Sequence, residues 1–148
     1  MIKMRLPALV AWGRVVADLP ACHPNHRVLR AYFDALTKLD PDGIAQLFAE
    51  HGEIEDPVGT SVRRGRPAVV EYWRSGLCAV AERIEIEILA ALPAARSIAA
   101  HWRMTAYGRD GRVADAEGID VLQVNDHGQI SRAEGYWDQQ AFRCALAG

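Results

Sequence analysis

Four strand-like segments joined by short turns occupy the C-terminal half of this chain. Residues 83–89 alternate polar and apolar side chains, and residues 97–107, 113–124 and 130–137 also have strand character. Two glycine-containing sequences mark turns, Arg109-Asp110-Gly111 and Asn125-Asp126-His127-Gly128. Strands that follow one another through such short connections pair antiparallel, so this half of the chain predicts an antiparallel sheet.

The N-terminal half carries helical periodicity instead. One helix is expected from Asn25, a candidate cap, a shorter one between Asp40 and His51-Gly52, and a third from Gly65. Their apolar positions recur at three- and four-residue steps. These positions are Val28, Leu29, Tyr32, Phe33, Leu36 and Leu39, then Ile44, Leu47 and Phe48, then Val69, Val70, Tyr72, Trp73 and Leu77.

Helices first and antiparallel strands later predict an α+β fold, in which the three N-terminal helices cover one face of a curved sheet. A length of 148 residues suggests one domain. We assign residues 18–148 to that domain and residues 1–17 to an N-terminal extension. A short helix from Gln139 is expected to close the chain.

Composition narrows the function classes. A net charge of −2 does not favour nucleic acid or an anionic membrane as a partner. Cys22, Cys78 and Cys144 are widely spaced, which is typical of reduced thiols and predicts a cytoplasmic location. His23 and His26 lie near Cys22, but no second pair of ligands follows, so no metal site is predicted.

The N-terminal apolar run does not predict export or membrane insertion. Residues 6–12 are apolar, but Arg14 and Asp18 interrupt the run that a signal peptide would need. No other stretch approaches the ~18 apolar residues of a membrane helix.

Two acidic residues stand in unusual contexts. Asp56 ends an extended segment before Pro57, and Asp120 lies between Ile119 and Val121 in an apolar strand. A charge buried there is costly unless it is paired or neutralised, and a protonated carboxyl can donate a hydrogen bond. Two acids in contrasting environments can therefore supply a base and a donor to one site. Asp56 could instead be a turn residue, and Asp120 could lie on a solvated face.

The order of elements, together with five short motifs, resembles the cone-shaped nuclear transport factor 2-like (SnoaL-like) fold and, within it, the steroid Δ5-3-ketoisomerases. The motifs are Arg30-Ala31-Tyr32, Glu55-Asp56-Pro57-Val58-Gly59, Ile119-Asp120-Val121, Asn125-Asp126-His127-Gly128-Gln129-Ile130 and Tyr136-Trp137. The resemblance implies a cofactor-free isomerase that moves the Δ5 double bond of a 3-oxosteroid, or a similar hydrophobic ketone, to Δ4. It also implies a homodimer.

The resemblance gives three residues catalytic roles. Asp56 would be the base that carries the proton, and Tyr32 and protonated Asp120 would donate hydrogen bonds to the substrate oxygen. Tyr32 by itself could also be a packed helix residue with a satisfied hydroxyl. The positions of further supporting tyrosines in this family hold Phe48 and Trp73 here, so we expect no long tyrosine network.

The alternation of the strands adds a hydrophobic lining for the substrate. The expected substrate-binding residues are Leu36, Trp73, Trp102, Met104, Leu122 and Trp137. His101 and Arg103 should point away from the Trp102 face, which disfavours the Asp-Arg-Asp set of epoxide hydrolases with this fold. A same-fold dehydratase, cyclase or epoxide hydrolase stays open as an alternative, as does a non-catalytic module that binds a hydrophobic ligand.

Overall fold

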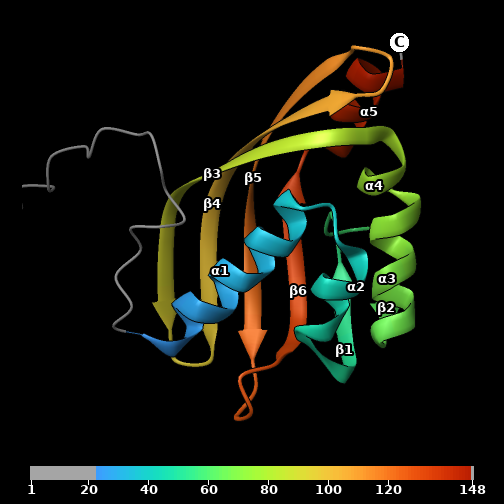
Figure 1. Ribbon diagram of the computed structural model, residues 1–148. Coiled ribbons are helices and arrows are strands. Elements are labelled where there is room, and N and C mark those ends of the chain that lie inside the picture. Colours follow the sequence, from blue (N-terminus) through green and yellow to red (C-terminus); the bar gives the residue numbers. More distant parts are fainter. Residues whose placement is uncertain (1–22, 148) are drawn as a thin grey trace, which may run out of the picture.

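A curved six-stranded sheet forms the body of the molecule in this computed structural model, which describes residues 23–147 (Figure 1). Its strands are β1 (Phe48–Glu55), β2 (Arg63–Arg64), β3 (Ala81–Ala94), β4 (Ser97–Gly108), β5 (Val113–Val124) and β6 (Ile130–Trp137). They lie in the order β2-β1-β6-β5-β4-β3, and every neighbouring pair is antiparallel except β1 with β6. The predicted antiparallel meander is confirmed.

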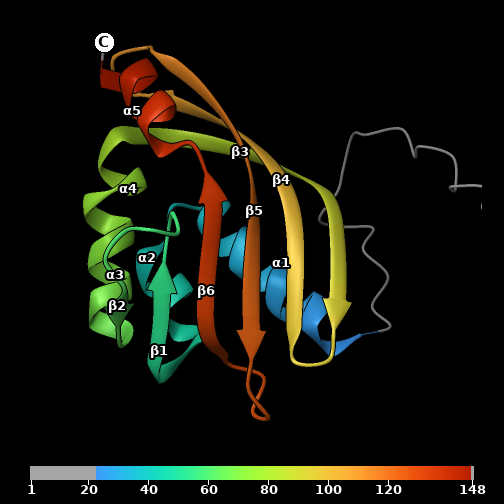
Figure 2. The same cartoon turned by 180° about the vertical axis from the view of Figure 1, so that it is seen from behind.

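Helices cover one face of this sheet and leave the other open, as Figure 2 shows. They are α1 (Pro24–Thr37), α2 (Pro41–Gln46), α3 (Arg66–Ser75), α4 (Leu77–Val80) and α5 (Gln139–Ala147). Helix α1 crosses the covered face, α3 lies beside the β1 edge, and α5 lies at one end of the sheet (Figure 1). The predicted α+β class with three N-terminal helices is therefore confirmed, and the predicted extension 1–17 lies outside the described residues.

The expected end of the second helix was wrong. Phe48 and His51 were assigned to this helix, but α2 ends at Gln46 and both residues belong to β1. Ile130 N donates to Leu47 O at 2.8 Å, and Phe48 is in register with Ile130. Parallel pairing with a strand about 80 positions later thus overrides a local pattern that fits a helix.

Asn25 has a different role from the predicted cap. His23 caps α1, because its Nδ1 accepts from Asn25 N at 3.2 Å. The side-chain nitrogen of Asn25 donates to Ala95 O and Ser97 O, each at 3.2 Å. Asn25 therefore fastens the start of α1 to the β3–β4 turn.

We expect Asn25→Ala to lower the free energy of unfolding by about 1–3 kcal/mol, because the backbone carbonyls of Ala95 and Ser97 lose their donor. Urea unfolding measures this change. Asp34→Ala, on an exposed position of the same helix, is the control. A loss equal to that of the control would show that these hydrogen bonds do not hold α1.

Within residues 23–147, no helix has the length and apolar character needed to cross a membrane. Cys78 and Cys144 are free thiols, and Cys22 lies outside the described residues.

Candidate functional site

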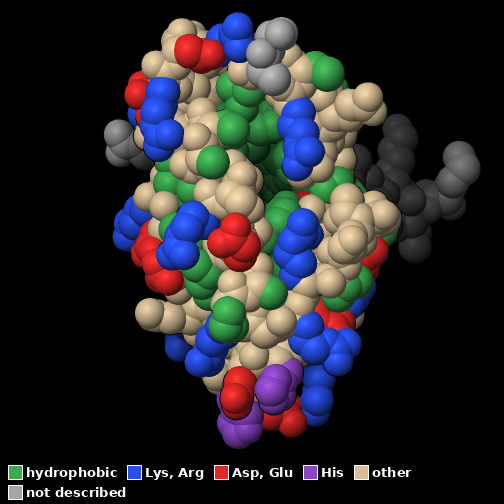
Figure 3. Space-filling view, turned by 90° about the vertical axis from the view of Figure 1, so that its right-hand side faces the viewer, with side chains coloured by type: hydrophobic (Ala, Val, Ile, Leu, Met, Phe, Trp, Pro, Cys, Tyr) green, Lys and Arg blue, Asp and Glu red, His purple; other side chains and the backbone are tan. Residues whose placement is uncertain are grey.

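A cavity of about 460 Å³ opens between the covered face of the sheet and the helices. Figure 3 shows its entrance as a hollow lined with hydrophobic side chains. The apolar residues of its wall are Phe33, Leu36, Trp73, Leu77, Val80, Ile86, Trp102, Met104, Trp137, Phe142 and Leu146. Both its size and its lining suit a small hydrophobic ligand.

Two carboxyls lie in this apolar wall. Asp56, directly after β1, and Asp120, in β5, both line the cavity and are both only 6% exposed. The β5–β6 register places Asp120 opposite Gly135. A Cβ atom on Gly135 would stand 2.7 Å from Asp56 Cγ, so the Asp56 side chain lies directly over that glycine. The sheet thus brings the two acids to the same face.

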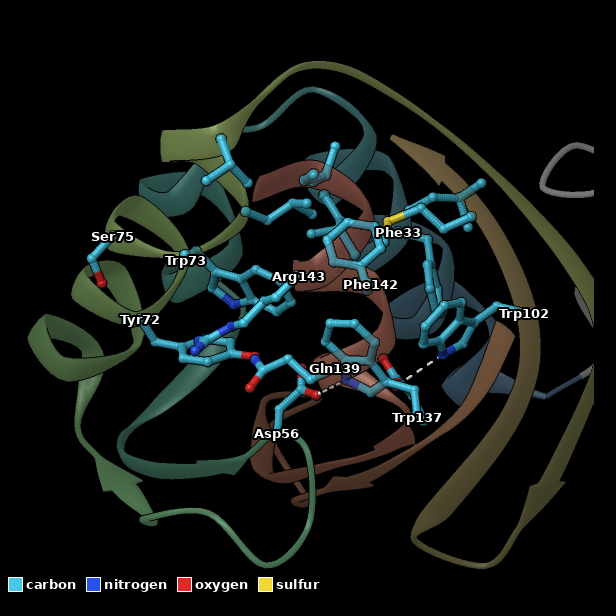
Figure 4. Close-up of a pocket in the computed structure, with 18 of the residues that line it drawn as sticks. Phe33, Asp56, Tyr72, Trp73, Ser75, Trp102, Trp137, Gln139, Phe142 and Arg143 are labelled. Atoms are coloured by element: carbon cyan, nitrogen blue, oxygen red, sulfur yellow. Dashed lines mark hydrogen bonds between the residues drawn. The ribbon is translucent and has the colours of Figure 1, made fainter. Parts of the chain in front are cut away.

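Each carboxyl accepts a hydrogen bond from its own tryptophan (Figure 4). Trp102 Nε1 donates to Asp120 Oδ1 at 2.9 Å, and Trp137 Nε1 donates to Asp56 Oδ1 at 2.5 Å. The two indoles lie 6.1 Å apart between ring centroids. Gly118 makes this possible, because a Cβ atom there would stand 2.6 Å from the Trp102 ring and 2.8 Å from Trp137 Cβ.

The surroundings of the two acids differ. Burial, followed by the charge of Asp56, raises the pKa of Asp120 well above its ordinary value, and only the Trp102 hydrogen bond opposes this. Burial also raises the pKa of Asp56, but hydrogen bonds from Trp137 and Tyr72 and the charge of Arg63 all lower it. These contacts favour an ionised Asp56 beside a protonated Asp120.

Tyr32 lies behind the cavity wall rather than in it. Its side chain is 1% exposed, and its ring meets that of Trp73 edge-on, with centroids 6.3 Å apart. Burial, and then the charges of Asp120 and Asp56, raise the pKa of Tyr32 well above its ordinary value. Its hydroxyl therefore stays protonated and keeps the capacity to donate.

Five of the six predicted substrate-binding residues line the cavity: Leu36, Trp73, Trp102, Met104 and Trp137. Leu122 does not, because it lies two positions beyond Asp120 on β5 and is completely buried in the core. Leu122 was predicted to bind substrate because it shares a strand face with Asp120. That shared face does not bring it into contact with the cavity.

The outer face of the sheet carries the two residues expected to point away. His101 Nε2 lies 2.6 Å from Glu117 Oε1, and Arg103 Nε lies 3.7 Å from Glu117 Oε2. Neither lines the cavity. Among the described residues, no three His, Cys, Asp or Glu side chains are grouped as they would be to hold a metal ion.

Five polar residues of the cavity wall were missed by the sequence analysis: Arg63, Tyr72, Ser75, Gln139 and Arg143. Tyr72 lies close enough to Asp56 to lower the pKa of that carboxyl, and the Tyr72 ring lies 4.7 Å from the guanidinium carbon of Arg63. Arg143 lines the cavity from α5. The sequence did carry a signal for α5, since Gln139, Phe142, Arg143 and Leu146 have the spacing of one helical face. Tyr72 had no such signal, because it read as an ordinary apolar helix position beside Trp73.

Comparison with known proteins gives the family. Residues 29–133 match the model of the SnoaL-like domain, which is most of the chain. The chain belongs to the SnoaL-like family. A steroid Delta-isomerase of Nocardioides simplex is 35% identical over 106 residues, which cover 72% of this chain and 83% of that enzyme. The resemblance to ketosteroid isomerases that the motifs indicated is therefore confirmed.

Solved structures share the fold of this SnoaL-like protein. The Δ5-3-ketosteroid isomerase of a Mycobacterium species aligns with a TM-score of 0.69 and 23% identity, covering 80% of this chain and 95% of its own. A Mycobacterium tuberculosis protein in complex with estradiol-17β-hemisuccinate aligns with a TM-score of 0.70 and 22% identity, covering 80% and 96%. SalBIII, an epoxide hydrolase/cyclase-like enzyme of salinomycin pyran ring formation, aligns with a TM-score of 0.68 and 26% identity. The alignment covers 78% of this chain and 91% of SalBIII.

Proposed function

We propose that this protein is a cofactor-free isomerase that moves the Δ5 double bond of a 3-oxosteroid, or a similar hydrophobic ketone, into conjugation at Δ4. One observation carries the proposal: two buried carboxyls in different electrostatic surroundings share an apolar cavity, each with its own indole donor. The identity to a steroid Delta-isomerase supports the same chemistry.

In the proposed reaction Asp56 removes a proton from C4, because its carboxylate is the more readily ionised of the pair. The electrons shift towards the C3 oxygen and form a dienolate. Protonated Asp120, which lines the cavity, donates a hydrogen bond to this oxygen as its negative charge grows. The Tyr32 hydroxyl is the second donor, and it has to turn from behind the wall towards the cavity to reach the oxygen. The same Asp56 carboxyl then returns its proton at C6, so the atoms and charges balance without a cofactor.

The direct test is the ultraviolet absorbance of a conjugated enone after the protein meets a 3-oxo-Δ5-steroid. We expect rapid growth of this absorbance that depends on Asp56. If a phenolic steroid binds tightly but no enone forms, the isomerase proposal fails, and the protein is a non-catalytic binding module or acts on another reaction.

Gly135 should be essential for activity because it leaves room for Asp56. We expect Gly135→Ala to reduce kcat by about 100-fold, since a displacement of the base by ~1 Å is enough for such a loss. Gly43→Ala is a matched control, because its Cβ atom would stand 2.8 Å from Cγ of another aspartate, Asp40, at the exposed start of α2. The control should retain wild-type kcat in the enone assay. Equal activity of the two variants would contradict the placement of Asp56 as the base.

Epoxide opening or cyclisation is a second candidate, favoured by one observation. Arg63 lines the cavity together with Asp56 and Asp120, so the cavity contains two aspartates and an arginine. The arginine of this Asp-Arg-Asp set is Arg63 and not Arg103, which does not line the cavity. In such a reaction Asp120 would protonate the epoxide oxygen while Asp56 accepts a proton from the attacking hydroxyl or water. Conversion of a hydrophobic epoxide, lost in Arg63→Gln, by a protein inactive on the Δ5-ketone would select this candidate.

We also propose that the protein is a homodimer through the open face of the sheet. Ile119 and Tyr136 are directly opposite each other on β5 and β6 and are 45% and 48% exposed. Light scattering after gel filtration should give twice the mass of one chain for the wild type. Tyr136→Arg should yield monomers, whereas Val62→Arg, at a position 46% exposed, should not. A monomeric wild type at tens of micromolar would refute the dimer.

A further inference from the structure

Helix α5 presents a positive charge to the cavity. Gln139, Phe142, Arg143 and Leu146 all line it, and their spacing forms one helical face. An amphipathic helix normally directs its charged residues away from the apolar region that it covers. Arg143 departs from this rule, since it lies on the same face as Phe142 and Leu146.

Among residues 23–147, no carboxylate forms an ion pair with Arg143. The positions three and four residues away on α5 hold Gln140, Leu146, Gln139 and Ala147, none of which is acidic. Elsewhere in the described part of the chain, Arg143 is in no ion pair, in contrast to Arg96, Arg112 and Arg132.

The other charges of the cavity do not balance it either. The residues that line the cavity include two arginines, Arg63 and Arg143, and two acids, Asp56 and Asp120. Arg63 acts on Asp56, whose pKa it lowers, and Asp120 is held protonated by burial. Among the charges that line the cavity, that of Arg143 is therefore left uncompensated.

We propose that Arg143 binds a carboxylate carried by the hydrophobic ligand at the end remote from its ketone. This inference rests on the proposed function, which places the ketone oxygen at Asp120. Asp120 accepts from Trp102, and Figure 4 shows Arg143 on the opposite side of the cavity from Trp102. A rigid apolar body would span the space between them, against side chains such as Phe142 and Leu146.

The charge of the ligand then becomes part of substrate selection. A carboxylate on Arg143 gains a charge-assisted hydrogen bond, which Arg can make with two parallel N–H donors. Arg143 is exposed, so solvent weakens the attraction, and the gain stays within the modest range of surface pairs. A neutral ligand of the same shape would bind through the apolar wall alone.

A matched pair of ligands tests the inference: a 3-oxo-Δ4-steroid with a carboxylate at C17, and its methyl ester. Quenching of tryptophan fluorescence gives both dissociation constants, because Trp73, Trp102 and Trp137 line the cavity. In wild type at low ionic strength, we expect the acid to bind about fivefold more tightly than the ester. Added salt at about 0.5 M should remove most of this preference, because it screens exposed charges.

In Arg143→Gln the ratio of the two constants should fall to one or below. Arg96→Gln removes the same charge from the β3–β4 turn, far from α5 in Figure 1, and should keep the wild-type ratio. Equal binding of acid and ester by wild type, or a preference that survives in Arg143→Gln, would overturn the inference and leave the isomerase proposal intact.

The outcomes separate the two proposals. If the acid is preferred through Arg143 but its Δ5 isomer is not converted, the carboxylate site stands and the isomerase proposal falls. If neither ligand binds, both are overturned.

Discussion

Asp56→Asn should lower kcat for the Δ5-to-Δ4 shift by about 10²- to 10⁴-fold, the usual contribution of a positioned general base. Asparagine has the same shape, and its side-chain oxygen can still accept from Trp137 Nε1, but it cannot take up a proton. The Asp120 and Tyr32 donors are unchanged, so the affinity for a 3-oxo-Δ4-steroid should stay within about threefold of wild type, less than one good hydrogen bond contributes.

Stopped-flow absorbance of the enone and fluorescence titration of the product measure the two quantities separately. Asp115→Asn is the matched control, because it makes the same change on an exposed position of β5. The control should match wild type in both. Wild-type turnover by Asp56→Asn would exclude Asp56 as the proton carrier.

Asp120→Asn should have opposite effects on activity and on stability at neutral pH. Asparagine resembles a protonated carboxyl in shape and can accept from Trp102 Nε1, but its amide donates more weakly to a developing oxyanion. Loss of one strong oxyanion donor reduces kcat by about 10²- to 10³-fold. The folded protein, however, no longer buries an acid that ionises with difficulty, so the free energy of unfolding at pH 7 should rise.

The sign of the pH effect follows from the raised pKa of Asp120. Between the ordinary value of 3.8 and the raised value, the folded state binds more protons than the unfolded state. The stability that Asp120 contributes is therefore complete below pH 3.8 and is lost as the pH rises through the folded-state value. Urea unfolding from pH 4 to pH 8 should show this decline in wild type and in Asp115→Asn, and a weaker one in Asp120→Asn. Parallel curves would mean that Asp120 is not a buried, protonated acid.

The sequence predicts the regular part of this fold well because its signals are local. The strands from Ser97 to Trp137 follow one another through turns that pair neighbours, so alternation and turn residues determine the sheet. Only the extended end of strand β1 was predicted. Its start was missed because its partner, β6, is distant in the sequence and parallel. The residues from Phe48 to His51 contain no local feature that distinguishes that pairing from the end of a helix.

The residues of the candidate site likewise fall into those that a local sequence signal reveals and those that it does not. Asp120 could be recognised because an acid between Ile119 and Val121 contradicts its apolar strand, and that contradiction is visible in a single segment. Arg63 lies over the Tyr72 ring, and both residues lower the pKa of Asp56. Tyr72 comes from α3 and Arg63 from β2, so no single segment of the sequence shows that they belong together. Leu122 shows the opposite error, a residue that was predicted in the site but lies outside it. The predicted strand face was correct, but its depth in the core depends on how the helices close over the sheet.

The contact between Trp137 and Asp56 also has a consequence for the order of folding. The two residues are 81 positions apart, and Gly135, over which Asp56 lies, is almost as distant. Such contacts carry the loop-closure entropy of more than half the chain, and contacts of this kind form slowly. During synthesis, the meander of β3, β4 and β5 can pair before β6 is available, whereas Asp56 gains its setting only when β6 joins β1. The candidate site is thus among the last features that the nascent chain completes.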